Sequence, residues 1–503
     1  MTQSAGHRMS DARLLCVFGT GSDVGKSWIT AGLCRLFADA GVSVAPYKAQ
    51  NMSNNAGVTP AGLEMGRAQI VQAHACRLVP HVDMNPLLLK PNTDTGAQVI
   101  ALGRVLGSMS ARDYFRGGQA ADERRALVHD ALDRLRAKYP LIIAEGAGSC
   151  AEVNLRQRDL VNMPIAHHGD GAVLIVADIH KGGVFAQCVG TLACMPPADR
   201  ARVKGFIINR FRGDASLFED GRAWIEAETG IPVLGVVPWS THIQIELEDG
   251  LSPDTIVDGP APADPTRFHV AVLRLPHISN FTDFDALERH GVQIHYVTRL
   301  RALAPYDLVV LPGSKNTRGD LTWLRAQGWD RQLKARAQNG GAILGICGGY
   351  QMLGRRIADP FGVEGTPGDT PGLGLLPVET VMAREKTTRQ VQGRLGDTPV
   401  TGYEIHVGET TLEGDPLLWL HTPDGQPHPD GARQGLTFGT YLHGLFDAPG
   451  VVASLLGPIR PELEWPTVPS HATWRDAQLS RLAAHLRAHL DLEVLAKITG
   501  MAT

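Results

Sequence analysis

Residues 14–27 read LLCVFGTGSDVGKS, an apolar run followed by a glycine-rich loop that ends in Gly-Lys-Ser. The apolar run predicts a buried strand. After Gly25, apolar residues recur at helical spacing from Ile29 to Phe37, and Gly41 can end that helix. A strand, a glycine loop and a helix in this order predict the phosphate-binding start of an α/β domain.

The loop is a variant of the strict phosphate-binding pattern, which has glycine where Thr20 stands. Gly21 and Gly25 let backbone N–H groups approach a phosphate. Lys26 is expected to reach the β- and γ-phosphates, and the Ser27 hydroxyl is expected to reach a magnesium ion. An ordinary strand–helix turn is the alternative, but the strand–loop–helix context favours a nucleotide site.

Glu145 ends another apolar run, LIIAE (141–145). Parallel strands place their carboxyl ends at one edge of the sheet, where a carboxylate can hold Mg²⁺ beside the phosphates. A solvated acid at a strand end is the alternative reading, and the phosphate loop favours metal binding. The expected metal ligands are therefore Ser27 and Glu145.

Apolar runs separated by helical stretches predict a parallel sheet covered on both faces. The expected strands are 14–19, 42–48, 141–148, 172–178, 203–210 and 232–238. After a stretch rich in Pro, Asp and Gly, a second series of strands is expected at 269–275, 307–313, 342–347 and 437–444.

This pattern predicts two α/β domains. We expect an ATP-binding domain at 1–245, a linker at 246–266 and a second domain at 267–503. Leucines between 479 and 490 recur at helical spacing, so a helix near 474–497 is expected to pack on the second domain.

Cys347 lies in GICGG (345–349), directly after the apolar run AILGI. Small residues on either side allow a strained strand-to-helix turn that presents a nucleophile. The helix N-terminus favours the thiolate, and backbone N–H groups there can stabilise an oxyanion, with LPGS (311–314) as a second donor loop. A thiolate nucleophile needs a base, and His443 in TYLHG (440–444) is the leading candidate.

The composition argues against several other classes of protein. The 503 residues carry a net charge of −4, so no overall basic field is available for nonspecific binding to nucleic acid. No apolar run approaches the ~20 residues that span a bilayer, and the first residues lack the apolar core of a signal peptide. Seven cysteines without Cys-x-x-Cys spacing indicate neither a disulfide framework nor a structural zinc site. We therefore expect a cytoplasmic protein that binds neither nucleic acid nor membrane.

The order of these motifs resembles that of the glutamine-dependent amide synthetases, and the details resemble the cobyric acid synthase family over nearly the whole chain. The stretches that carry the resemblance are GTGSDVGKS (19–27), YKAQNMSNN (47–55), EMGRAQ (64–69), MNPLLLKP (84–91), AEGAGS (144–149), ADIHKGGVFA (177–186), INRFRGD (208–214), ISNFTDFD (278–285), LPGSKNT (311–317), GICGGYQ (345–351), GYEIHVG (402–408) and TYLHGLF (440–446). The first half is also similar to dethiobiotin synthetase, which has the same variant loop.

The resemblance implies a fold with a dethiobiotin synthetase-like P-loop domain followed by a class I glutamine amidotransferase-like α/β domain. It implies MgATP as a cosubstrate and no tightly bound cofactor. The implied roles are ATP binding by Gly21, Gly25, Lys26 and Ser27, magnesium binding by Glu145, contact with phosphate and carboxylate by Lys48, and a place near adenine for Asn209.

The resemblance also implies the reaction. Cys347 attacks the side-chain amide of glutamine, and His443 moves the protons. The ammonia travels to the P-loop domain, where ATP has turned a carboxylate into an acyl phosphate, and displaces the phosphate. In the family this happens at the b, d, e and g carboxylates of adenosylcobyrinic acid a,c-diamide, in cobalamin (vitamin B12) biosynthesis. Glutamine, ATP and a corrinoid polycarboxylate are thus the expected partners, and a homo-oligomer is compatible with the sequence.

Candidates for binding the corrinoid carboxylates are Arg67, Lys90 and Lys181, although each of them is more often expected as an ordinary surface charge. The sequence also departs from one pattern. Many class I glutaminase domains carry His-x-Glu, in which the acid orients the histidine, and Leu445 stands in its place here. Glu404 and Asp447 are the acids considered instead. The site of the cobyric acid synthase family resembles a Cys–His dyad without the third residue, so Leu445 does not indicate inactivity.

Four alternatives were weighed against this interpretation. The sister enzyme that amidates the a and c carboxylates usually differs around the nucleophile, and KAQNMSNN (48–55) favours the cobyric acid synthase family. CTP synthase has the same domain order but keeps His-x-Glu. A partitioning ATPase, which is a switch and not a ligase, carries a lysine where this chain has Gly21. A binding protein with a degenerate glutaminase domain is opposed by the intact Cys347 and His443.

Overall fold

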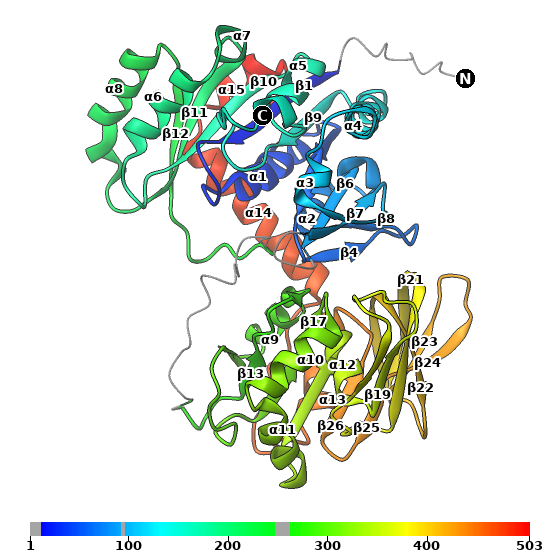
Figure 1. The fold of residues 1–503 in the computed structure, drawn as a ribbon. Helices are drawn as coiled ribbons and strands as arrows, with labels where there is room; N and C mark the ends of the chain where they lie inside the picture. Colours follow the sequence, from blue (N-terminus) through cyan, green and yellow to red (C-terminus); the bar gives the residue numbers. More distant parts are fainter. Residues whose placement is uncertain (1–11, 92–95, 247–261, 263) are drawn as a thin grey trace, which may run out of the picture.

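The computed structural model describes residues 12–91, 96–246, 262 and 264–503. Figure 1 shows two bodies, an N-terminal body built on one large sheet and a C-terminal body built on another. The residues at 1–11 and most of the predicted linker at 246–266 lie outside the described ranges. None of the described helices combines the length and the apolar character needed to cross a membrane.

The N-terminal body is organised by a parallel six-stranded sheet, which confirms the predicted fold class for this half. Its order is β12 (Val233–Pro238), β11 (Val203–Phe211), β10 (Ala172–Asp178), β1 (Arg13–Gly19), β9 (Leu141–Glu145) and β2 (Val44–Tyr47). Alternate residues of β1 join different cores: Cys16 faces one side and Val17 the other. Both faces are therefore buried, which is why the strands read as continuous apolar runs.

Helices cover the two faces of this sheet. One face carries α4 (Gln119–Arg136), α5 (Met163–His168), α6 (Val184–Cys194) and α8 (Glu219–Thr229), the other carries α1 (Lys26–Asp39), and α2 (Arg67–Ala75) contributes residues to both cores. The short helices α3 (Ala111–Tyr114) and α7 (Pro197–Arg200) complete this body. The sheet order puts the loops after β1 and β9 side by side at the carboxyl edge, where ligands bind in open α/β sheets.

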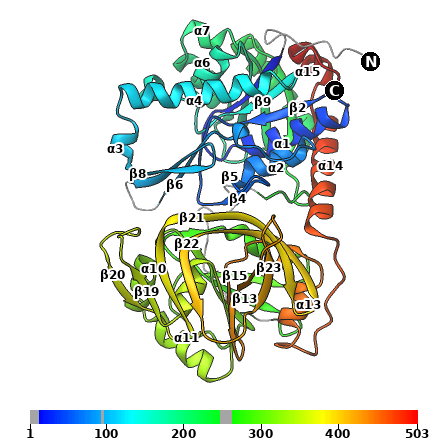
Figure 2. The same cartoon turned by 90° about the vertical axis from the view of Figure 1, so that its right-hand side faces the viewer.

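Two small sheets extend the N-terminal body toward the other body, and sequence analysis did not predict them. One contains β3 (Gln50–Met52), β6 (Leu87–Pro91), β7 (Gly96–Ala101) and β8 (Arg104–Ser110), and the other pairs β4 (Ala56–Val58) with β5 (Glu64–Gly66). Figure 2 shows β4, β6 and β8 between the parallel sheet and the C-terminal body.

The C-terminal body contains a second, mainly parallel sheet, with helices packed against it. The sheet order is β15 (Gln293–Val297), β13 (His269–Leu273), β16 (Leu308–Leu311), β18 (Ala342–Ile346), β26 (Thr437–Thr440) and β25 (Ala432–Gln434), of which β25 alone runs antiparallel to its neighbour. The helices of this body are α9 (Asp285–Glu288), α10 (Thr317–Ala326), α11 (Trp329–Gln338), α12 (Gly348–Leu353) and α13 (Val451–Leu456). A short ladder pairs β14 (Ile278–Ser279) with β17 (Gly313–Ser314).

A further sheet in this body was not predicted. It is formed by β19 (Arg356–Asp359), β20 (Gly368–Pro371), β21 (Val378–Leu395), β22 (Thr398–Leu412), β23 (Leu418–His421) and β24 (Pro427–Asp430). Its long hairpin, β21–β22, lies along the side of the C-terminal body that faces the N-terminal body (Figure 2).

The C-terminal helices correct one expectation. The segment forms α14 (His471–His489) and α15 (Leu492–Thr499), which pack on the N-terminal body and not on the second domain. Gly32 of α1 makes the close approach possible, because a Cβ there would lie 2.4 Å from Leu486 Cδ1. The chain thus returns to its first body after completing the second (Figure 2).

Candidate active sites

The phosphate-binding loop has a conformation that requires glycine. Gly25 caps α1 in the left-handed region with φ 93°, and a Cβ there would lie 2.2 Å from Asn209 Nδ2. Lys26 points back into the loop, where its Nζ donates to the carbonyl oxygens of Gly21 at 2.8 Å and Gly148 at 3.2 Å. The N-terminus of α1 and the Lys26 ammonium therefore both lie at the loop, and their positive charge suits a polyphosphate.

Glu145 lies beside this loop and is fully buried. The Ser27 hydroxyl donates to its Oε1 at 2.7 Å, Lys48 Nζ lies 2.9 Å from the same oxygen, and Gln72 donates to Oε2. Burial alone would raise the pKa of Glu145, but the charge of Lys48 and the three hydrogen bonds lower it below its usual value. An ionised carboxylate next to a serine hydroxyl fits Mg²⁺, which prefers a few oxygen ligands together with phosphate oxygens.

Asn209 ends the buried part of β11, and its amide donates to the carbonyl oxygen of Val24 at 2.9 Å. Asn209 therefore supports the phosphate-binding loop through the backbone of Val24.

The sequence does not predict the contact of Gln72 with Glu145, because a glutamine within a helix belongs to no recognisable motif.

The nucleophile of the C-terminal body lies in a strained turn between β18 and α12. Cys347 has φ 52° and ψ −110°, which is unusual for a residue with a side chain. A Cβ on Gly349 would lie 1.9 Å from Leu311 O, and one on Gly348 would lie 2.9 Å from Ser314 N. The glycines after Cys347 are thus needed for the LPGS loop at 311–314 to pack against the elbow.

His443 faces this cysteine and is tied to a carboxylate. Its Nδ1 lies 2.6 Å from Asp283 Oδ2, and the backbone N–H of Gly444 donates to Asp283 Oδ1 at 3.1 Å. Burial alone would lower the pKa of His443, but the charge of Asp283 and hydrogen bonds to Asp283 and Cys347 raise it to about 9. Because the other imidazole nitrogen is left for the sulfur, the three side chains form a Cys–His–Asp arrangement.

Asp283 is a residue that the sequence analysis missed as the acid. The two acids considered instead bind other partners: Glu404 pairs with Arg389 at 2.5 Å, and Asp447 pairs with His471 at 3.4 Å. Tyr403 forms a β-bridge with His443, and its ring stacks on the imidazole. Because successive residues of a strand point to opposite faces, the side chain of Glu404 points away from His443. The ISNFTDFD stretch carried the resemblance, but nothing local in it assigns Asp283 to a histidine 160 residues later.

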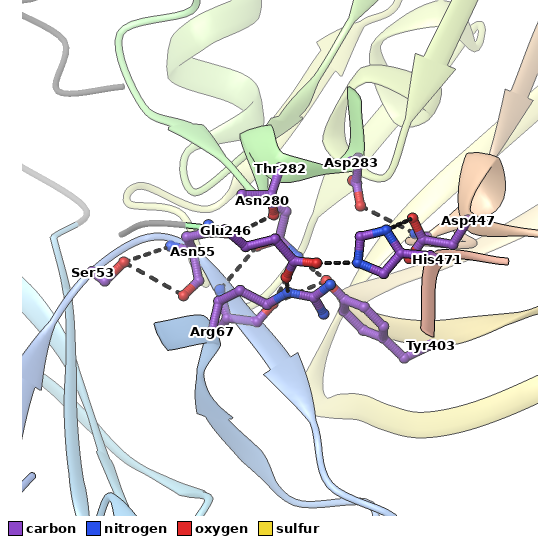
Figure 3. Close-up of polar contacts among 12 residues, drawn as sticks. Ser53, Asn55, Arg67, Glu246, Asn280, Thr282, Asp283, Tyr403, Asp447 and His471 are labelled. Carbon is purple, nitrogen blue, oxygen red and sulfur yellow. Dashed lines mark hydrogen bonds and ion pairs between the residues drawn. The ribbon is translucent and has the colours of Figure 1, made fainter. Parts of the chain in front are cut away.

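The acid is held from across the junction of the two bodies (Figure 3). Asp283 belongs to the 3₁₀ turn η4 (Phe281–Phe284). Its neighbour Thr282 donates to Asn55 Oδ1 at 3.0 Å, and Asn280 Nδ2 donates to the carbonyl oxygen of Ala56 at 3.1 Å. Residues just after Lys48 in the N-terminal body therefore hold the turn that carries the acid.

A second set of contacts joins the bodies nearby. Arg67 Nε lies 2.5 Å from Glu246 Oε2, and Glu246 also binds His471, whose other nitrogen faces Asp447 (Figure 3). Arg67 is thus a half-buried cation, 13% exposed and paired with Glu246, and not an ordinary surface charge.

Of the other two cations considered for the corrinoid, Lys90 is fully buried against Glu64 at 2.6 Å, which also contradicts a surface position. Lys181 is exposed, as an ordinary surface lysine would be.

A phosphate-binding loop in one body and a cysteine elbow with its histidine in the other define the class: a glutamine amidotransferase joined to a nucleotide-binding domain. Family models agree with this. A CobQ/CobB/MinD/ParA nucleotide binding domain matches residues 15–253, and a CobB/CobQ-like glutamine amidotransferase domain matches residues 269–451.

The relatives narrow the class further. Cobyric acid synthase of Chlorobium phaeobacteroides (strain BS1) is 51% identical over 497 residues, which cover 97% of this chain and 99% of the relative. Cobyric acid synthase of Chlorobaculum tepidum is 51% identical over 496 residues, covering 97% and 98%. The chain belongs to the cobyric acid synthase family.

Proposed function

We propose that this protein is a carbon–nitrogen ligase that uses ATP and glutamine to amidate the b, d, e and g carboxylates of adenosylcobyrinic acid a,c-diamide, giving adenosylcobyric acid. The relatives, which match along almost the entire chain, support this reaction. The observation that carries it is the presence of both half-sites in one chain: the loop around Lys26 and the Cys347–His443–Asp283 group.

The C-terminal body supplies the nitrogen. Cys347 Sγ attacks the side-chain carbonyl carbon of glutamine, and backbone N–H groups at the elbow stabilise the oxyanion. His443, protonated by the thiol and held by Asp283, gives its proton to the leaving nitrogen, and ammonia departs. Water then attacks the thioester, His443 takes a proton from it, and glutamate is released with the thiol restored.

The N-terminal body activates the corrinoid carboxylate for attack by ammonia. A carboxylate oxygen of the corrinoid attacks the γ-phosphorus of ATP, ADP leaves, and an acyl phosphate forms. Lys26 stabilises the charge on the transferred group, and Ser27 with Glu145 would hold Mg²⁺. When bound, that ion neutralises the negative charge of the β- and γ-phosphates. Ammonia attacks the acyl carbon, phosphate leaves, and an amide remains.

The same proposal assigns Lys48 to the neighbourhood of the reacting phosphate and carboxylate, which its contact with Glu145 supports. Gly21 and Gly25 would admit the phosphates, and Asn209 would act near the nucleotide by bracing the loop. We further propose that the working units follow the predicted division at 1–245 and 267–503, with the C-terminal helices assigned to the first unit. ATP and glutamine are cytoplasmic metabolites, so we propose that the enzyme is cytoplasmic.

Mass spectrometry of the corrinoid product tests the proposal. The protein is incubated with adenosylcobyrinic acid a,c-diamide, glutamine and MgATP, and four successive carboxylate-to-amide conversions are expected. A sister amidase specific for the a and c positions would leave this substrate unchanged, because those positions are already amides. A partitioning ATPase would consume ATP without changing the corrinoid. Either result would overturn the proposed function.

A further inference from the structure

A cluster of charges lies where the two bodies meet, with Glu64 and Lys90 buried and Lys315 and Lys386 half-buried. Glu64 of β5 and Lys90 of β6 come from the N-terminal body, and Lys386 of β21 comes from the C-terminal body. Lys90 Nζ lies 2.6 Å from Glu64 Oε1, and Lys386 Nζ lies 2.5 Å from Glu64 Oε2. Lys315, which follows the LPGS loop, lies close enough to Lys90 for the two charges to repel each other. One carboxylate thus faces three lysines.

Glu64 and the three lysines together carry a net positive charge. Burial, followed by repulsion from Lys90, lowers the pKa of Lys315 to about 7. Burial also lowers the pKa of Lys386 to about 8, although Glu64 attracts it. Partial burial of neighbouring ammonium groups that share one carboxylate is unfavourable, so the carboxylate of a bound ligand would stabilise them.

Lys315 and Lys386, the two lysines of the C-terminal body, line the same pocket as the nucleophile Cys347. A pocket at the junction is lined by Cys347, His443, Lys315, Lys386, Glu364 and Gln351 of one body and by Gln98 and Ser108 of the other. The charge of an ionised Cys347 raises the pKa of both lysines.

The backbone of β21 aims Lys386 at this pocket. Met382 pairs with Gly408 and Thr387 pairs with His406, so five steps along β21 oppose two along β22. The extra residues form a bulge that contains Lys386. Bulges of this kind redirect side chains next to functional sites.

We propose that Lys315 and Lys386 form the subsite that binds the α-carboxylate of glutamine. The inference rests on the proposed glutamine hydrolysis and adds its recognition site. Glutamine is short, so an amide at Cys347 leaves its carboxylate in the same pocket, and the carboxylate completes the charge of the cluster. Glu364, on the same wall, offers opposite charge to the α-ammonium group. Since Glu64 of the N-terminal body pairs with Lys386, and Gln98 and Ser108 of that body line the pocket, glutamine is bound only where the two bodies meet.

A pair of substrates isolates this subsite. Glutamine is compared with 4-aminobutanamide, which is glutamine with a hydrogen in place of the α-carboxylate, and ammonia release is measured without corrinoid. The wild-type enzyme is expected to favour glutamine by about 100-fold or more in kcat/KM. In Lys386→Met and Lys315→Met this preference should fall at least about tenfold, mainly through a higher KM for glutamine. Lys386→Arg should keep much of the preference, and Lys334→Met, an exposed lysine of α11, should keep all of it.

Each outcome decides the inference. A wild-type enzyme that does not distinguish the two substrates would overturn it. So would methionine variants that lose activity equally on both, because that loss indicates only a structural role. Since ammonia release needs no corrinoid, an enzyme that cleaves glutamine but leaves the corrinoid unchanged would contradict the proposed function and leave this test intact.

Discussion

Cys347 has the backbone conformation of a nucleophile elbow and lies beside His443, so its sulfur is expected to be essential for using glutamine. Cys347→Ala should lower glutamine-driven amidation by at least about 10³-fold, because no other group on the elbow can form the thioester. Amidation driven by added ammonium salts should persist, since the N-terminal body needs only ammonia. The measurement is corrinoid amide formation with either nitrogen source, and loss of both activities would contradict the division into two sites.

Asp283 sets the protonation of His443, so its replacement should change the pH profile. The raised pKa keeps the imidazolium populated up to about pH 9. In Asp283→Asn, burial acts without the opposing carboxylate, so the pKa falls and the alkaline limb of glutamine hydrolysis should move to lower pH. The rate at neutral pH should fall by about 10²–10⁴-fold. Ammonia-driven amidation is the control, and an unchanged profile would exclude Asp283 as the acid.

The same shift also contributes to stability. Because the folded-state pKa of His443 lies above its ordinary value of 6.5, its contribution is fully present below about pH 6.5 and is lost as the pH rises through about 9.

Local motifs predict roles for Cys347, Lys26 and Ser27 because a few neighbouring residues indicate the chemistry of each. Asp283 could not be found in this way: its distance from His443 is set by the packing of η4 against η5 (Leu445–Asp447), the turn that follows the histidine. The sequence analysis considered Glu404 and Asp447, whereas the acid that contacts His443 in the structure is Asp283, 160 residues upstream.

The turn η4 is expected to depend on the N-terminal body. Thr282→Val removes the hydroxyl that donates to Asn55 and leaves its shape nearly unchanged. Loss of one such hydrogen bond is typically about 1 kcal/mol, so kcat for glutamine hydrolysis should fall about fivefold with little change in KM. Thr282→Ser keeps the donor and should restore kcat. A valine variant with wild-type kcat would show that the contact does not position Asp283.

Helix α14 is expected to stabilise the N-terminal body. Leu486 is fully buried against α1, so Leu486→Ala should lower the free energy of unfolding by about 2–4 kcal/mol. Urea denaturation measures this, and Arg487→Ala, an exposed position on the same helix, is the matched control. Equal midpoints for the two variants would mean that the helix does not support this core. The leucine spacing predicted the buried face, but it contained no information on which body would cover it.

Considered as one molecule, the protein follows its sequence most closely where strands are buried on both faces. The runs that became β1, β9 and β10 were predicted because parallel strands need apolar residues on both sides. The sheet containing β21 and β22 was missed because its strands are half-exposed and carry charges such as Arg389 and Glu404, which interrupt the alternation. These unpredicted elements form much of the junction, and so the contacts between the two bodies could not be predicted from the sequence.

The last prediction separates the two sites from the opposite side. Lys26→Ala should lower both glutamine-driven and ammonia-driven amidation by at least about 10²-fold, because the charge on the transferred phosphate loses its stabilising ammonium. Glutamine cleavage should continue, since Cys347, His443 and Asp283 lie in the other body, and the ammonia should then appear in solution without amide. Measuring glutamate and amide together reports this uncoupling, and Lys138→Ala, an exposed lysine, is the control. Ammonia-driven turnover that persisted in Lys26→Ala would contradict the assignment of the loop to phosphate, whereas loss of glutamine cleavage as well would contradict the independence of the two sites.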